Sequence, residues 1–113
     1  MTLIFHITTK QDWETAVSAN HYHTHSLDSE GFIHCSTREQ VIGTANAYFH
    51  GQTDLLLLCL DPARITADIV YEDLYGKGQQ FPHIYGSLSL DAVVHVIPFP
   101  PAADGSFTLP EGI

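Results

Sequence analysis

Basic residues are scarce in this 113-residue chain, and they are far outnumbered by acidic ones. Four Lys and Arg residues stand against 13 Asp and Glu residues, which gives a formal charge of −9 at neutral pH. A protein that follows a nucleic-acid backbone needs clustered basic side chains, so this balance argues against nucleic acid as a partner. It argues equally against an anionic membrane surface. Any basic pocket would have to be built locally, from Lys10, Arg38, Arg64 or Lys77.

Long apolar runs and cysteines are also missing or few. No stretch approaches the roughly 20 apolar residues that a membrane-spanning helix needs, and no basic segment followed by an apolar one suggests a signal peptide. The two cysteines, Cys35 and Cys59, are too few for a disulfide framework and are expected to be free and buried. We therefore expect a cytoplasmic protein with one domain, over residues 1–113, whose partner is a small molecule.

The apolar pattern predicts an α+β fold. Strands are expected over residues 3–7, 31–35, 55–60, 69–71, part of 84–90, and 92–97. Two main helices are expected over 10–20 and 37–50, the second opened by Ser36 with Glu39 at capping-box spacing. The unbroken apolar run Leu55–Leu60 is typical of a central strand that is covered on both faces. Strands outnumber helices and do not alternate with them regularly, which favours α+β over α/β.

Three histidines lie in segments that resemble one another chemically. His6 lies within the first predicted strand, His34 within the second, and His83 in the segment 81–86. If that last segment is extended, Phe81, His83 and Tyr85 share one face and form an aromatic wall suited to stacking a planar ring. Each histidine could equally be a packing residue bonded to the backbone, so the functional interpretation requires that all three meet in one cleft.

Other residue patterns leave alternatives open. Glu30 and Glu72 are the acids nearest to these segments, and either could be a catalytic carboxylate or a solvated surface charge. His21, His23 and His25 alternate within 20–29, a segment expected to be a loop. In an extended chain they would share a face and could bind zinc as three imidazole ligands, which would make the protein a metal-dependent hydrolase.

Cys35 is also a potential nucleophile, but its neighbour His34 points to the opposite face of a strand and is poorly placed to relay a proton. A small buried apolar role is therefore favoured for Cys35. No glycine-rich nucleotide loop of either the Rossmann or the Walker type is present in the sequence.

Several segments taken together resemble the small proteins grouped as domain of unknown function 952 (DUF952). The resemblance lies in Phe5-His6-Ile7, Asp12-Trp13, Ser26-Leu27, Glu30 to Ser36, Gln40-Val41, Ala45-Asn46, Phe49, Asp54 to Pro62, Glu72 and Phe81 to Gly86. It covers nearly the whole chain. The fold of this family is similar to that of ADP-ribosyltransferases. This implies a curved, split, mixed sheet of about five to seven strands, with NAD as a substrate in the cleft.

The resemblance also implies roles for individual residues. Catalytic roles are expected for His6, His34, His83 and Glu72, and ligand-binding roles for Phe32, Ser36, Thr37, Tyr85 and Gly86. The implied activity is ADP-ribosyl or phosphoryl transfer, or hydrolysis, on a small substrate. The third segment does not have the Glu that often directs ribosyl transfer. A non-catalytic module that kept the fold and binds a small molecule is therefore the alternative.

Eight histidines make the charge of this protein sensitive to mild acid. Protonating all of them would change the formal charge from −9 to −1, and a reference His pKa near 6.5 places this change between about pH 7.5 and 5. We therefore expect solubility to fall as the pH is lowered over this range, because the repulsion between molecules weakens. Solubility measured by precipitation assay would contradict this if it stayed constant from pH 7.5 to 5.5.

Overall fold

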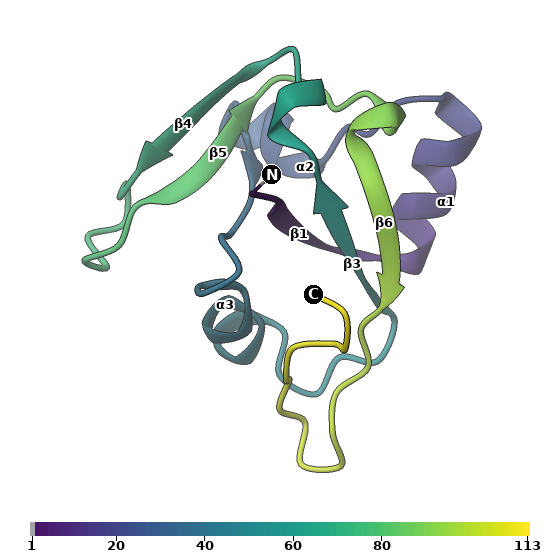
Figure 1. The fold of residues 1–113 in the computed structure, drawn as a ribbon, viewed down its shortest axis with the longest axis vertical. Coiled ribbons are helices and arrows are strands. Elements are labelled where there is room, and N and C mark those ends of the chain that lie inside the picture. The colour runs from purple at the N-terminus through teal and green to yellow at the C-terminus, as the bar shows by residue number, and fades with distance from the viewer. Residues whose placement is uncertain (1) are drawn as a thin grey trace.

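The computed structural model describes residues 2–113 and confirms an α+β fold within them (Figure 1). The strands are β1 (Ile4–Thr9), β2 (Ile33–His34), β3 (Leu55–Leu60), β4 (Asp68–Glu72), β5 (Phe81–Tyr85) and β6 (Val93–Pro98). The α-helices are α1 (Lys10–Ala19), α2 (His25–Ser29) and α3 (Val41–Tyr48), and the 3-10 helices are η1 (Pro62–Arg64) and η2 (Leu90–Ala92).

The strands form two separate three-stranded sheets, where we expected one curved, split, mixed sheet of about five to seven strands. Across residues 2–113, β1, β3 and β6 make one sheet in the order β1-β3-β6, and the other has the order β2-β5-β4. Every pairing between these strands is antiparallel, so the prediction of a mixed sheet was wrong. The sheets meet at Phe5 and Ser36, where each backbone N–H donates to the other residue's carbonyl at 2.8 Å.

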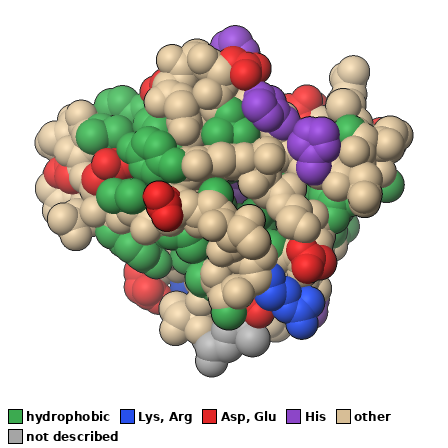
Figure 2. Space-filling view, turned by 90° about the horizontal axis from the view of Figure 1, so that it is seen from above, with side chains coloured by type: hydrophobic (Ala, Val, Ile, Leu, Met, Phe, Trp, Pro, Cys, Tyr) green, Lys and Arg blue, Asp and Glu red, His purple; other side chains and the backbone are tan. Residues whose placement is uncertain are grey.

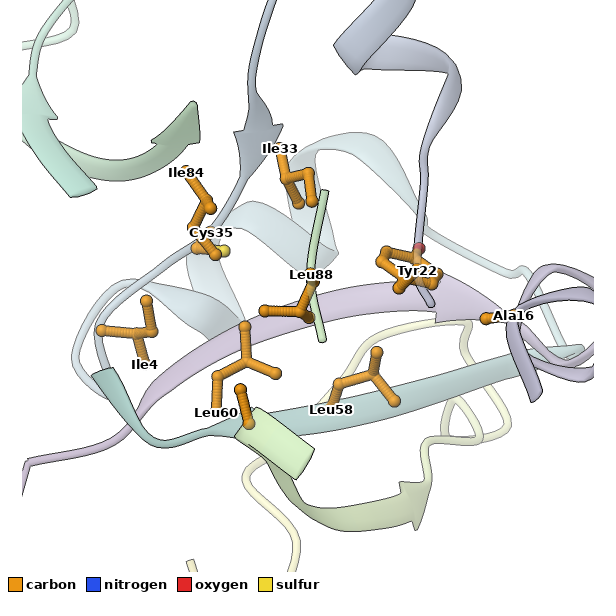
Figure 3. Close-up of a cluster of buried hydrophobic side chains, with 10 residues drawn as sticks. Ile4, Ala16, Tyr22, Ile33, Cys35, Leu58, Leu60, Ile84 and Leu88 are labelled. Atoms are coloured by element: carbon orange, nitrogen blue, oxygen red, sulfur yellow. The ribbon is translucent and has the colours of Figure 1, made fainter. Parts of the chain in front are cut away.

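Strand β3 is buried on both faces, as its unbroken apolar run predicted. Leu58 and Leu60 pack into the cluster between the sheets, where they meet Ile33 and Ile84 of the second sheet (Figure 3). The alternate residues, Leu57 among them, face a second cluster formed with α3 and the chain that follows β6. Each face of the first sheet is therefore covered, and this fixes the position of α3 against β1.

The helix predicted over 37–50 is shorter than expected and begins at Val41. The Gln40 side chain accepts a hydrogen bond from the Thr37 backbone N–H at 3.0 Å and donates to the Gln80 carbonyl at 2.8 Å. These bonds hold residues 37–40 as a turn linked to the β4–β5 hairpin. Ser36 is consequently not a helix cap, and the anion site that we would expect at such a helix start has no basis here.

Three smaller expectations about the helices also need correction. The capping-box spacing of Thr8 and Gln11 predicts Thr8 as the cap of the first helix, but Thr9 caps α1, because its hydroxyl accepts from the Asp12 backbone N–H at 3.1 Å. Residues 25–29 form α2, although 20–29 was predicted to be a loop. The helical spacing of apolar residues predicts that Val17 and Tyr48 lie on buried helix faces, but they are 53% and 61% exposed. No helix within residues 2–113 has the length and apolar character needed to cross a bilayer.

Gly86 follows β5 at a point where two segments come very close. A Cβ atom at this position would lie 2.9 Å from the Ala67 Cβ, too close for a normal contact. We expect Gly86→Ala to destabilise the fold by about 1–3 kcal/mol, the usual cost of overpacking. Urea denaturation measures this change. The matched control is Gly43→Ala in α3, where a Cβ has open space and should stabilise by about 0.5–1 kcal/mol.

Replacing Ala67, the residue that a Cβ at position 86 would contact, tests why Gly86→Ala destabilises the fold. If crowding against Ala67 is responsible, most of the effect of Gly86→Ala should disappear when Ala67 is replaced by Gly in the same chain. An undiminished loss of stability in the Ala67→Gly background would contradict this explanation.

Candidate functional site

A cavity of about 450 Å³ lies where the two sheets diverge beyond the Phe5–Ser36 bridge. Its walls come from β1, the chain that follows β2, α3 and the β4–β5 hairpin, which spreads away from the first sheet above α3 (Figure 1). Its polar lining consists of His6, His34, Ser36, Thr44, Tyr48, Glu72, Asp73, Tyr75, Lys77 and His83. Segments far apart in the sequence thus supply one concave site of ordinary ligand-binding size.

His83 is the most deeply buried titratable side chain in this lining, and it is held by a carboxylate. Its Nδ1 lies 2.8 Å from Glu72 Oε2, and the His83 side chain is only 3% exposed. The Tyr85 hydroxyl donates to the same Glu72 oxygen. The bond from Tyr85, followed by the bond from His83, lowers the pKa of Glu72. An ionised Glu72 can only accept, so the His83 Nδ1 carries the proton and donates it.

The other nitrogen of His83 is available to a ligand. A neutral imidazole protonated at Nδ1 has a lone pair at Nε2. Within the described residues, His83 Nε2 makes no hydrogen bond. Every buried side-chain nitrogen or oxygen in this part of the chain does have a hydrogen-bond partner, so Nε2 is not among the buried atoms. Nε2 therefore reaches open space, and the cavity is the space that His83 borders. This is the tautomer in which a carboxylate orients a histidine to act as a general base.

Phe32 fixes the plane of the His83 ring. The two rings are stacked, with centroids 4.1 Å apart and 20° between their planes. Phe32 is 3% exposed and lies behind His83, away from the cavity lining. Register explains the contact: His34 pairs with His83, so Phe32 and His34 lie on the same face of the sheet as His83. Phe32 therefore positions a ring and makes no direct contact with the cavity.

A second unit of the same kind contains Glu30, His34 and Tyr75. The His34 Nε2 lies 2.6 Å from Glu30 Oε2, and the Tyr75 hydroxyl donates to Glu30 Oε1 at 2.6 Å. These bonds, with that from Tyr75 the larger cause, lower the pKa of Glu30. The Tyr75 ring stacks on His34 at 6.2 Å. The rings of His34 and His83 are 5.5 Å apart and nearly perpendicular, so the two units adjoin.

His6 lies in the cavity wall with both ring nitrogens already bonded. Its Nδ1 donates to the His34 carbonyl at 2.5 Å, and its Nε2 is hydrogen-bonded to the Tyr22 hydroxyl at 2.8 Å. That hydroxyl also bonds to Thr8 Oγ1 at 2.7 Å. Burial, the largest cause, lowers the pKa of His6 to about 4, although the bond to the His34 carbonyl works in the opposite direction. This geometry fits a positioning role, because His6 ties β1 to β2.

The structure brings together five of the nine residues for which we expected functional roles. His6, His34, Ser36, Glu72 and His83 line the cavity, and the chemistry expected of them stays a prediction. The remaining four, which were expected to bind the ligand, are absent from the lining: Phe32, Thr37, Tyr85 and Gly86. Direct ligand contacts by these four do not follow from this geometry.

Each of the four has a structural partner that explains its place. Phe32 stacks on His83, and Thr37 bonds to the Gln40 side chain. The Tyr85 hydroxyl is taken up by Glu72, while Gly86 permits the close approach of Ala67. They support the site from behind or beside it.

Sequence reasoning missed the contribution of the β4–β5 loop and of α3. Tyr75 comes from residues 74–80, whose two glycines predict a loop, and Tyr48 comes from the helix face that the apolar spacing predicts to be buried. One sequence feature could have indicated Tyr75: it lies next to Gly76, in a loop that joins the segment with Glu72 to the segment with His83 and Tyr85. Of the four basic residues considered for a local pocket, Lys77 alone lines this cavity.

The histidines of 20–29 do not assemble a metal site. Within residues 2–113, no three His, Cys, Asp or Glu side chains are grouped so as to hold a metal ion. The proposed alternation required an extended backbone, but α2 begins at His25. His23 instead bonds to Asp28 at 2.9 Å, and the His21 ring bonds to the Ala19 carbonyl at 3.2 Å. The interpretation as a metal-dependent hydrolase loses its structural basis.

Comparison with known proteins identifies the family. The sequence profile of a family described as "Protein of unknown function (DUF952)" matches residues 7–96. The chain belongs to the DUF952 family. The matched range includes His34, Glu72 and His83, and it begins one residue after His6. Among proteins with curated descriptions, none matches the sequence.

Two solved structures of one protein have a fold very similar to that of this chain. The crystal structure of protein CC0527 from Caulobacter crescentus is 32% identical, with a TM-score of 0.86, and the match covers 96% of this chain and 95% of that one. The solution NMR structure of CC0527 is 30% identical, with a TM-score of 0.81, and the match covers 100% and 97%. Membership of DUF952 is thus confirmed, whereas these neighbours give no support to an ADP-ribosyltransferase-like fold.

The buried His6 should make the stability of this DUF952 domain depend on pH. Its folded pKa of about 4 lies below the reference of 6.5, so the unfolded chain binds the extra proton first as the pH falls. The contribution of neutral His6 to the free energy of unfolding is fully present above pH 6.5. It is lost on acidification, and the free energy of unfolding falls by roughly 2 kcal/mol between pH 7.5 and 5. Urea denaturation at the two pH values, with His6→Gln and the exposed-site control His95→Gln, measures this contribution.

The result expected is a smaller pH dependence in His6→Gln and an unchanged one in His95→Gln. If His6→Gln does not fold, NMR titration of the His6 ring in the parent protein gives the answer. A midpoint near pH 6.5 would contradict the account.

Proposed function

We propose that this DUF952 protein binds an N-ribosyl compound of the NAD or ADP-ribose type in the cavity and hydrolyses it or transfers its ribosyl group. The observation that carries the proposal is the Glu72–His83 pair, whose second imidazole nitrogen borders the cavity. A base oriented by a carboxylate is what activation of water or of an acceptor hydroxyl requires.

The proposed chemistry needs one proton acceptor and a shielded site for a ribose. In hydrolysis, the bond between ribose C1′ and the ring nitrogen of the leaving base breaks, and its electron pair remains on that nitrogen. A water oxygen bonds to C1′, and the proton that this water releases goes to His83 Nε2 and then to solvent. The ionised Glu72 stabilises the imidazolium that forms. His34, with its own Glu30 partner, lies beside His83 and faces the same ligand.

The surroundings of the two histidines suit a planar leaving base. Phe49, Phe81, Tyr48 and Tyr75 contribute aromatic surface to the cavity, and such rings stack on heterocycles. Ser36 and Thr44 place two hydroxyls 3.3 Å apart in the same lining, where they can bond to ribose hydroxyls. His6 contributes to the proposed site indirectly, since its bond to the His34 carbonyl positions the backbone of that residue.

Calorimetric titration with NAD, ADP-ribose and nicotinamide tests binding, and release of nicotinamide from NAD tests turnover. We expect His83→Asn and Glu72→Gln each to lower turnover by about 100-fold, the usual effect of losing general-base catalysis. His95→Gln, at an exposed position on β6, should leave turnover unchanged. Absence of heat from all of these ligands, and also from nicotinamide riboside, at millimolar concentration would overturn the proposal.

A non-catalytic binding module is the second candidate, and the state of His6 favours it. An imidazole with both nitrogens bonded within the protein cannot also hold a ribose hydroxyl. Binding of NAD or ADP-ribose without any turnover, and with equal affinity in the parent and in His83→Asn, would establish this candidate over the enzyme.

A further inference from the structure

We infer that the ligand of this cavity is a nucleoside without phosphate, and most specifically an aromatic cation such as a pyridinium N-riboside. The inference rests on the proposed function and narrows its ligand. It follows from three features of the cavity. Lys and Arg are scarce in the lining, the Asp73 side chain bonds to the backbone N–H groups of the β4–β5 loop, and the Lys77 ammonium lies over the Tyr48 ring.

Positive charge is almost absent from the cavity. Lys77 is the single Lys or Arg that lines it within residues 2–113, while Glu72 and Asp73 supply two carboxylates. Arg38 donates to the Ile113 carbonyl, and Arg64 pairs with Asp61 at 3.5 Å. Figure 2 shows how small an area of one face Lys and Arg cover. A pyrophosphate would enter a site of net negative charge, in a protein of charge −9.

The backbone N–H groups of the glycine-containing loop beside the cavity are already bonded within the protein. Gly76 and Gly78 adopt positive φ angles on either side of Lys77, as in loops whose N–H groups converge on an anion. Here the Asp73 side chain takes that place: its two oxygens accept from the Lys77 and Gly78 backbone N–H groups, each at 2.8 Å. A carboxylate of the protein thus stands where a phosphate oxygen would bind.

The aromatic wall already holds a cation. The Lys77 ammonium lies over the Tyr48 ring, 5.1 Å from its centroid, at the side of the cavity formed by α3. Ring faces attract cations through their quadrupole. A planar cation such as a pyridinium ring could take the same face, and the adjacent Glu72 and Asp73 would favour its charge. The Ser36 and Thr44 hydroxyls remain for the ribose.

The size of the cavity agrees with this occupant. A volume of about 450 Å³ lies in the lower part of the usual range for small-molecule sites. That volume has to hold a base and a ribose beside His34 and His83. Any phosphate attached to the ribose would extend toward the acidic rim or into solvent, with Lys77 as the single Lys or Arg side chain of the lining to set against Glu72 and Asp73.

Calorimetry on the whole chain with nicotinamide riboside, nicotinamide mononucleotide, NAD and ADP-ribose tests the inference. We expect the riboside to bind about tenfold or more tightly than NAD and than the mononucleotide, because the phosphate groups of both make their net charge negative and repel the acidic lining. If NAD or ADP-ribose binds more tightly than the riboside, this inference falls while the proposed function stands. If none of the four binds, both fall.

A pair of variants separates the electrostatic cause from a simple fit of shape. Asp73→Asn removes a carboxylate from the cavity lining. The gap between the two affinities, measured as the ratio of the NAD dissociation constant to that of the riboside, should therefore become smaller. Asp68→Asn removes the same charge from the exposed far end of β4 and should leave the gap unchanged. A gap that stays the same in Asp73→Asn would contradict the electrostatic argument.

The affinity of Lys77→Gln for the riboside provides an independent test of where the ligand cation binds. If Lys77 competes for the Tyr48 face, its removal should leave riboside binding unchanged or tighter. A loss of riboside affinity of tenfold or more would overturn the assignment of this face to the ligand cation.

Discussion

The geometry of this protein depends on one short contact between the edges of two sheets. Phe5 and Ser36 exchange two backbone hydrogen bonds of 2.8 Å, and His6 adds a third from its ring to the His34 carbonyl. Beyond this contact the second sheet extends away from the first, and α3 packs against β1. Within residues 2–113 the two sheets exchange backbone hydrogen bonds only at Phe5 and Ser36, and the cavity lies beside this contact. Any shift of this junction would move His34 relative to α3.

The same junction explains why the imidazoles have defined orientations. His34 and His83 are register partners on adjacent strands, and each ring is held by a carboxylate and by an aromatic neighbour. Such stacked or edge contacts are worth about 0.5–1.5 kcal/mol each beyond burial, and the bonds to Glu30 and Glu72 set the tautomers. Two similar His–Glu–Tyr units side by side make the site acidic, aromatic and rich in proton acceptors.

Much of the fold followed from local sequence pattern. The apolar run of β3 predicted a central strand, and the alternation in the segment 81–86 placed Phe81, His83 and Tyr85 on one face as observed. Long-range contacts could not be read in this way. Gln40 bonds to the Gln80 carbonyl and stands before a helix that begins only at Val41, and Tyr75 bonds to Glu30, 45 residues away in the sequence. Sequence also does not reveal that Phe32 and Tyr85 support His83 and Glu72 from outside the cavity.

The central claim is that Glu72 fixes His83 with Nε2 unprotonated and open to the cavity. Long-range 1H–15N correlation NMR on the histidine rings tests it most directly, at a pH where the ring is neutral. We expect the His83 ring to carry its proton on Nδ1, and we expect this preference to weaken in Glu72→Gln. A neutral His83 ring protonated at Nε2, or one unaffected by the loss of the Glu72 charge, would contradict the account.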